Sequence, residues 1–145
     1  EEIRRDQIQT GYRRLKLPEG TLIIKAVFSL DRSTPEQVKA QIDGILARRL
    51  AGQPRGVKSA GCVFRNPPSR FAGRLIDQAG FKGLAVGRAW VSEKHANFIV
   101  HQGQATSGEV IELMERVRAG VRDRFGVELE PEIKIVGQDK EAGSA

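Results

Sequence analysis

Residues 71–101, FAGRLIDQAGFKGLAVGRAWVSEKHANFIVH, decide the fold class. The apolar side chains of residues 71–79 recur at helical spacing and stop at Gly80, which predicts a short helix with a glycine after its last turn. Two short strands are expected next, over residues 84–91, where a glycine interrupts the pattern, and over residues 96–101. A helix followed by neighbouring strands predicts an α+β fold with small mixed or antiparallel sheets.

Two longer helices are predicted on either side of this region. A threonine-proline pair beginning at Thr34 matches the start of a helix, and the apolar residues after it form one stripe to about residue 50. Thr106 and Glu109 have the spacing of a capping box, and the apolar face that follows them ends near Gly126. The second pattern is the clearest helical signal in the chain.

Further strands and a boundary are expected outside these helices. Residues 21–30, TLIIKAVFSL, are apolar and β-branched, which predicts a largely buried strand. Residues 127–136 alternate apolar and charged side chains, which indicates a strand with one wet face, and Pro131 favours an edge or a bulge. Residues 51–61 have almost no apolar periodicity, so we expect a linker or functional loop and a domain boundary there. The tail, 138–145, is expected to fray.

Composition and charge exclude several classes of protein. A hydrophobic fraction of 39% over 145 residues is normal for a globular chain, and a single cysteine cannot form an internal disulfide. Apolar stretches fall short of the roughly 20 residues of a membrane helix, and the first residues lack a secretory signal, so we expect a cytoplasmic protein. The net charge of +6 favours an anionic partner, which nucleic acid, a membrane surface or a phosphorylated metabolite would all satisfy.

Motifs for common cofactors are missing from the sequence. His95 and His101 have no nearby cysteine partner, so a zinc site is not expected. The chain has neither a dinucleotide fingerprint nor a phosphate-binding loop with its lysine. Residues 59–68, SAGCVFRNPP, place a thiol, a guanidinium and a carboxamide among glycine and proline, which suits a binding loop.

The residue patterns alone favour structural interpretations for four candidate features. Cys62 has the character of a small buried hydrophobic residue. The Arg65-Asn66 pair after it is typical of a turn. Glu132 is typical of the exposed member of an alternating strand, and Arg13 of a solvated charge. Pattern alone therefore indicates a basic α+β domain with an anion-seeking loop.

Four patches of sequence carry a resemblance that covers almost the whole chain. They are GYRR at 11–14, AGCVFRNP at 60–67, AGRLIDQAGFKG at 72–83 running on to VSEKHANFIV at 91–100, and LEPEIKIVG at 129–137. The sequence resembles the C-terminal part of the UDP-N-acetylenolpyruvoylglucosamine reductase family, in its shorter subtype. This resemblance implies an oxidoreductase that uses FAD and NADPH to reduce UDP-N-acetylglucosamine enolpyruvate to UDP-N-acetylmuramate for peptidoglycan synthesis, cell shape and division.

The resemblance also implies a division of the chain. Residues 1–50 match the end of the second FAD-binding domain, residues 51–125 the substrate-binding domain, and residues 126–145 a strand that returns to the FAD-binding domain with a tail. Family members hold most of their FAD in an N-terminal portion that these 145 residues do not contain. The expected partner is therefore an FAD-binding N-terminal half, in cis or in trans, without which the isolated chain is expected to be inactive.

Site residues follow from the same resemblance, position by position. Cys62 matches the family's serine proton donor, Arg13 its active-site arginine and Glu132 its active-site glutamate. Asn66 and His95 match substrate-contacting positions, and Arg49 falls on a lysine that meets the nucleotide or its phosphates.

Each catalytic role makes chemical sense, although the sequence departs from the family pattern. A thiol can protonate a carbanion, and a guanidinium can stabilise developing negative charge. The departures are Cys62 for the commoner serine, which adds an oxidisable group, Leu15 for a serine, and Arg88 for a glycine of a Gly-Gly pair.

Two other functions stay open at this point. A non-catalytic module would keep UDP-sugar affinity through Arg49, Asn66 and His95 but hold no flavin. A basic nucleic-acid binder would show affinity that falls steeply with salt, but the few aromatic residues form no stacking cluster in the sequence. Nucleic-acid binding is thus the less favoured alternative, and we expect neither nucleic acid nor a membrane as the partner.

Overall fold

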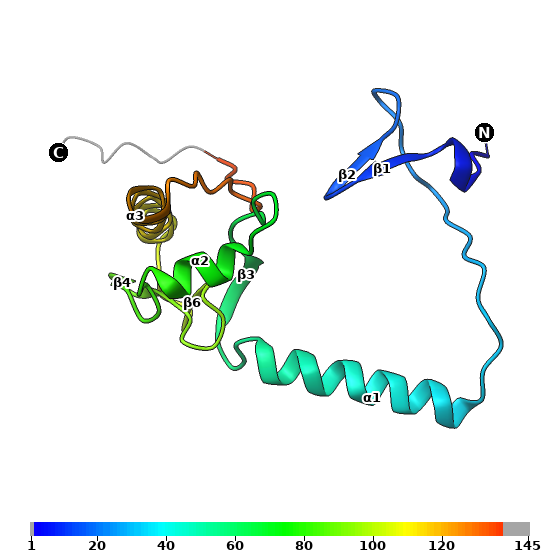
Figure 1. Cartoon of the computed structure of the whole chain (residues 1–145), viewed down its shortest axis with the longest axis horizontal. Coiled ribbons are helices and arrows are strands. Elements are labelled where there is room, and N and C mark those ends of the chain that lie inside the picture. Colours follow the sequence, from blue (N-terminus) through cyan, green and yellow to red (C-terminus); the bar gives the residue numbers. More distant parts are fainter. Residues whose placement is uncertain (1, 138–145) are drawn as a thin grey trace. The chain divides into compact units, whose positions relative to one another are not determined.

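The computed structural model describes residues 2–137 and divides into two compact units, Glu1–Pro35 and Glu36–Ala145. Figure 1 gives the order of the elements along the chain. In the first unit a short 3-10 helix, Arg5–Gln7, precedes a hairpin of β1 (Gln9–Gly11) and β2 (Arg14–Lys16). The strands pair antiparallel, and their two-residue turn ends at Arg13, whose φ of 56° is left-handed.

The prediction of a buried strand at residues 21–30 is wrong. These residues form neither helix nor strand, and Leu22, Ile24 and Leu30 are more than four-fifths exposed. A strand is stable only where a neighbouring strand pairs with it and another layer covers it. No described strand pairs with this segment, which explains the failure.

The helix predicted from Thr34 is present as α1 (Pro35–Gly52), but none of its side chains is buried. Its apolar stripe is exposed, with Ile42 and Ile45 at 50% and 55%. The loop expected over residues 51–61 is shorter than predicted, because α1 extends into it and β3 (Lys58–Cys62) occupies its second half. The boundary between the compact units falls after Pro35, while the functional division near residue 51 stays a prediction.

A four-stranded antiparallel sheet organises the second unit, in the order β3-β6-β5-β4. The other strands are β4 (Ala85–Val86), β5 (Ala89–Val91) and β6 (Phe98–His101). The segment predicted as one interrupted strand is thus a hairpin, turning at Gly87 and Arg88, and the antiparallel α+β class is confirmed. Gly87 takes a left-handed φ of 53° and Arg88 does not, so the replacement of a glycine by Arg88 leaves the backbone unstrained.

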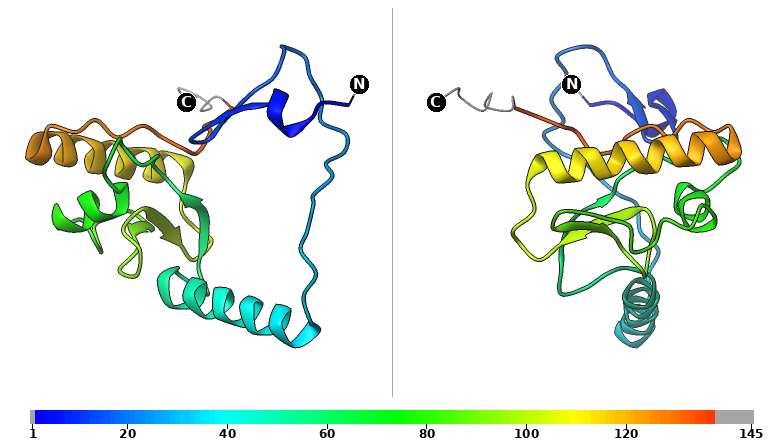
Figure 2. Two further views of the ribbon diagram at one scale, coloured as in Figure 1. Left: turned by 45° about the vertical axis from the view of Figure 1, so that its right-hand side comes forward. Right: turned by 90° about the vertical axis from the view of Figure 1, so that its left-hand side faces the viewer.

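Two helices pack with this sheet around one core. α2 (Ala72–Gln78) ends as predicted, because Gly80 and Phe81 donate to the carbonyls of Asp77 and Ile76, at 2.9 and 3.2 Å. α3 (Ser107–Phe125) lies along the sheet in Figure 2. The largest fully buried side chains are Phe64, Ile76, Leu113, Met114, Leu129, Val91, Val100, Val117 and Val121.

The capping predicted for α3 is confirmed at both ends. Glu109 N donates to the Thr106 hydroxyl at 3.2 Å, and Thr106 N donates to the Glu109 carboxylate at 2.8 Å. Gly126 follows the last turn with a left-handed φ of 65°. Local sequence therefore determined this helix.

The strand predicted over residues 127–136 is wrong, since only one isolated bridge forms, between Phe64 and Pro131. Proline has no N–H to donate, so Pro131 lies between two hydrogen bonds and donates neither of them.

The tail predicted to fray, 138–145, lies outside the described residues. Among the residues described, no helix is long and apolar enough to cross a membrane.

Candidate active site

The candidate site is built on residues 62–66, which continue from the end of β3. Cys62 pairs with Phe98 of β6 just after an irregularity in the strand, where Gly61 has a left-handed φ of 89°. An L residue adopts this conformation rarely, so glycine suits the position before the thiol. Cys62 itself is half-buried.

Asn97 holds the next residues in place from inside the core. The residue is 3% exposed, and its Nδ2 donates to the Phe64 carbonyl at 2.8 Å while its Oδ1 accepts from Phe64 N at 3.0 Å. Its backbone carbonyl also accepts from Val63 N at 2.8 Å. One buried carboxamide therefore satisfies both polar groups of a buried backbone unit, as a neighbouring strand would.

Asn66 and His95 both lie against the beginning of α2. The Asn66 Oδ1 accepts from Ala72 N at 3.0 Å, which ties the loop after Cys62 to the helix. His95 lies in the turn between β5 and β6, and a Cβ added at Gly73 would stand 3.1 Å from its Cε1. Gly73 thus allows the imidazole to approach α2 closely.

The environment of His95 favours its neutral form. Burial lowers the pKa of His95, a hydrogen bond to its own backbone acts in the opposite direction, and the nearby Lys82 lowers the pKa further. The Nδ1 atom accepts from Asn97 N at 3.2 Å, and the ring contacts Phe98 edge to face with centroids 4.8 Å apart. A neutral imidazole is suited to hydrogen bonding with a polar ligand rather than to a salt bridge.

Glu132 is brought to the same segment by the chain after α3. Its backbone N donates to the Val63 carbonyl at 2.7 Å, and Arg65 N donates to the Glu130 carbonyl at 2.8 Å. These two bonds flank Pro131 and place Glu132 beside the residue that follows Cys62. The sequence positions of Cys62, Asn66, His95 and Glu132 therefore converge on one backbone assembly.

Arg49 and Arg13 each contact residues close to them in the sequence. Arg49 lies in the last turns of α1, where its Nε donates to Gln53 Oε1 at 3.1 Å. The next residue, Leu50, accepts at its carbonyl from Lys94 Nζ at 2.7 Å, which ties this helix end to the turn that carries His95. Arg13 belongs to the first compact unit, where its guanidinium lies 5.8 Å from the Tyr12 ring centroid.

Two structurally important residues had no role predicted from the sequence. Asn97 is a polar residue inside an apolar run, a pattern that indicates a buried group with fixed partners. Gly73 adjoins His95 only because the fold brings α2 to that turn. The first had a recognisable signal in the sequence, whereas the second had none.

Comparison with known proteins gives a consistent result. Residues 53–136 match the family model described as UDP-N-acetylenolpyruvoylglucosamine reductase, C-terminal domain. A UDP-N-acetylenolpyruvoylglucosamine reductase of Geobacter metallireducens is 44% identical over 135 residues, which are 93% of this chain and 45% of that protein. Another, from Desulfosudis oleivorans, is 57% identical over 104 residues, covering 71% of this chain and 33% of that protein.

A solved structure is similar as well. The crystal structure of UDP-N-acetylenolpyruvylglucosamine reductase from Thermus caldophilus matches with a TM-score of 0.72 and 41% identity. The match covers 88% of this chain and 46% of that one. The chain thus spans less than half the length of these relatives.

Proposed function

The chain belongs to the UDP-N-acetylenolpyruvoylglucosamine reductase family, and we propose that it is the substrate-binding part of such a reductase. The proposed reaction reduces UDP-N-acetylglucosamine enolpyruvate to UDP-N-acetylmuramate with NADPH, in the cytoplasm, for peptidoglycan synthesis. The observation that carries this proposal is the convergence of Cys62, Asn66, His95 and Glu132 on one backbone assembly, which supports a shared site.

The reduction adds a hydride to the β carbon of the enol ether and a proton to the α carbon. Cys62 delivers the proton, because thiols are more acidic than hydroxyls and give a proton to a carbanion more readily. Arg13 stabilises the negative charge that develops on the substrate, since a guanidinium stays protonated and offers several donors. Glu132 is the third active-site group, and the described contacts support its approach to the backbone that carries Cys62.

The substrate is a diphosphate anion, and the remaining roles concern its binding. Asn66 and His95 contact the sugar nucleotide, with His95 acting as a neutral hydrogen-bonding group. Arg49 at the end of α1 meets the nucleotide or its phosphates, which guanidinium groups bind well. The net charge of +6 contributes to attracting such a ligand.

The residues of this chain fit the substrate better than the flavin. FAD supplies the hydride when it is bound, but the sequence has no glycine-rich phosphate-binding fingerprint to hold it. The proposal therefore includes an FAD-binding N-terminal half, in cis or in trans, as the partner that holds most of the cofactor. The chain by itself is expected to bind substrate without turnover.

This last point also defines the second candidate function, a non-catalytic module that binds a UDP-sugar. It is favoured by one observation: contacts within the second compact unit hold residues 62–66, His95 and Glu132 in place. A module of this kind would show no substrate reduction even after a flavin-binding half was added.

The nucleic-acid-binding alternative predicts salt-sensitive affinity for DNA of arbitrary sequence.

Calorimetric titration of the 145-residue chain with UDP-N-acetylglucosamine enolpyruvate tests the proposal. We expect saturable binding in moderate salt, where non-specific anion binding is screened, and binding at least tenfold weaker in a His95→Ala variant, since that change removes a polar contact. His101→Ala, at the end of β6 and outside the set of candidate site residues, serves as the matched control and should leave affinity unchanged. A cooperatively folded chain that failed to bind, or that bound duplex DNA equally well, would contradict the proposal.

A further inference from the structure

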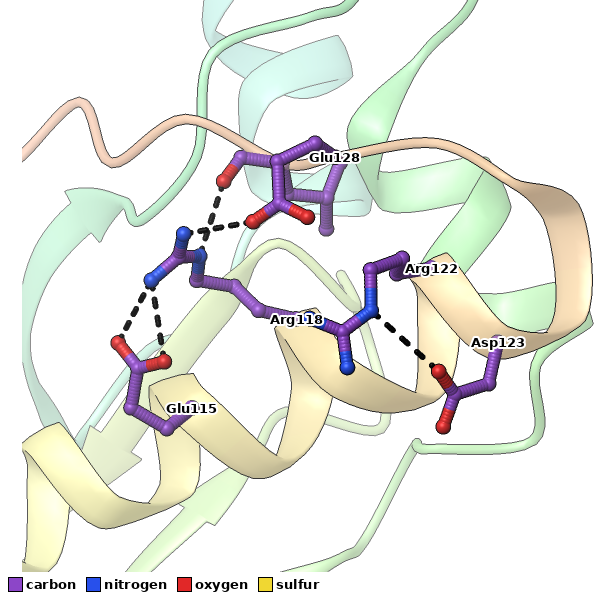
Figure 3. Close-up of polar contacts among 6 residues, drawn as sticks. Glu115, Arg118, Arg122, Asp123 and Glu128 are labelled. Carbon is purple, nitrogen blue, oxygen red and sulfur yellow. Dashed lines mark hydrogen bonds and ion pairs between the residues drawn. The ribbon is translucent and has the colours of Figure 1, made fainter.

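Arg118 of α3 joins three groups with one guanidinium, as Figure 3 shows. Its Nη1 donates to both carboxylate oxygens of Glu115, at 2.8 and 3.0 Å, and its Nη2 donates to Glu128 Oε1 at 2.6 Å. Its Nε donates to the Leu129 carbonyl at 3.1 Å. The two carboxylates raise the pKa of Arg118 above its ordinary value, so the side chain stays charged.

The backbone that Arg118 contacts leads directly to Glu132. Leu129 is fully buried, so its side chain fixes the segment on one side while Arg118 bonds its carbonyl on the other. The next residue, Glu130, accepts from Arg65 N at 2.8 Å and pairs with the Arg65 guanidinium at 3.6 Å. Glu132 N then donates to Val63, as described above.

The span between the two ends is short and stiff. Three residues of extended chain cover only about 10 Å, and Pro131 in the middle has a fixed φ. A displacement at Leu129 is therefore transmitted to Glu132 rather than absorbed between them. The ion pairs with Glu115 and Glu128 are themselves half-exposed, so they contribute little to global stability.

We propose that Arg118 is a positioning residue for Glu132, holding the backbone of residues 128–130 so that Glu132 stays beside the Cys62 segment. Its part in catalysis rests on the proposed function, in which Glu132 is an active-site group. Arginine is required because a planar fork can bond a carbonyl and two carboxylates together, whereas a lysine ammonium cannot reproduce that geometry. Arg118 acts through the backbone, without contact to the substrate.

Amide hydrogen exchange on the 145-residue chain tests the positioning directly. In Arg118→Lys we expect the amides of Glu132 and Arg65 to exchange about tenfold faster, because their bonds to Val63 and Glu130 open more often. The amides of Val63 and Phe64 bond to Asn97 instead, so they should keep their wild-type rates. Unchanged exchange at Glu132 and Arg65 would overturn the proposal.

A matched control lies one turn further along α3. Arg122 carries the same charge but, among the residues described, its ion pair is with the exposed Asp123, at 3.4 Å, so Arg122→Lys should leave all four amide rates unchanged. An Arg118→Gln variant repeats the test without the charge. Acceleration of all four amides together in both Arg118 variants would indicate a general loss of structure and would also overturn the proposal.

A double-mutant cycle in the reductase completed by its FAD-binding half tests the consequence. Arg118→Lys should lower kcat for the enol ether by ten- to a hundredfold with little change in KM, since small misplacements of an active-site group have effects of about this size. The same substitution in a Glu132→Gln background should have no further effect. Equal losses in both backgrounds would overturn the link to Glu132. An inactive wild-type reductase would contradict the proposed function instead, and the exchange comparison would still decide the positioning.

Discussion

Asn97 is the residue on which the geometry of the candidate site depends most. We predict that Asn97→Ala destabilises the chain by about 2–4 kcal/mol, because it leaves the buried N–H and C=O of Phe64 without partners. Urea denaturation measures the change, with the exposed Gln102→Ala as the control. A loss below about 1 kcal/mol would mean that the backbone around Phe64 finds other partners.

The proposed role of the Cys62 thiol predicts how the reductase responds to substitution and to oxidation. In the reductase completed by its flavin-binding half, Cys62→Ser should keep measurable substrate reduction, whereas Cys62→Ala should lose it by a factor of 10² or more, because only the alanine lacks a proton to donate. Mild peroxide should inactivate the wild type and spare Cys62→Ser, since a serine cannot be oxidised in this way. Full activity in Cys62→Ala would show that another group donates the proton.

His95 makes the stability of the chain depend on pH. Because the pKa of His95 is lowered in the folded state, the unfolded chain binds more protons just below pH 6.5, and folding stability falls as the pH decreases through that window. Stability is fully present above about pH 6.5. Urea denaturation between pH 5 and 8 should show a smaller decrease in His95→Gln than in the wild type. Identical pH profiles would mean that His95 titrates in the same way in both states.

At the scale of elements, signals contained within a few residues predicted structure well. The capping residues Thr106 and Gly126 and the glycine after α2 all act on neighbouring backbone, so the sequence alone defines those helix ends. The strands expected at 21–30 and 127–136 failed because a strand requires hydrogen bonds from another part of the chain. The first has no described partner, and Pro131 limits the second to a single bridge.

The candidate site, too, could not be predicted from local sequence signals. Its residues came from resemblance to a family, and the residue pattern alone favoured structural interpretations for Cys62, Arg13 and Glu132. The bonds from Asn97 to Phe64 join residues that are 33 positions apart, and Arg118 reaches Leu129 across a helix end. Such contacts depend on the assembled fold and leave little trace in local sequence.

Packing between α3 and the loop after α2 gives a prediction at this scale. A methyl group added at Gly120 would overlap the ring of Phe81, so Gly120→Ala should destabilise the second unit by about 1–3 kcal/mol even though alanine favours helices. Gly44 of α1 has open space around it, so Gly44→Ala is the matched control and should cause no loss. Thermal unfolding measures both, and a stabilised Gly120→Ala would show that Phe81 can move aside freely.

At the scale of the whole molecule, apolar side chains are distributed unevenly between buried and exposed positions. The second compact unit has a complete core around Leu113 and Leu129, both fully buried. Residues 21–30 and the stripe of α1 instead expose side chains such as Ile24, Phe28 and Ile45. Exposed apolar segments of this length are unusual in a protein that acts alone and mark surfaces that another element covers.

We expect the proposed FAD-binding half to cover the exposed apolar side chains of residues 21–30. Added in cis, it should protect the amides of residues 21–30 from exchange, because a strand gains hydrogen bonds and cover only from a neighbour. It should also lower the fluorescence of a dye that binds exposed apolar surface, compared with the 145-residue chain. The amides of α3 provide the internal control, since its own core already protects them. If residues 21–30 stayed unprotected in the longer protein while FAD was bound, the segment would have to be covered by another partner, such as a second copy of the chain.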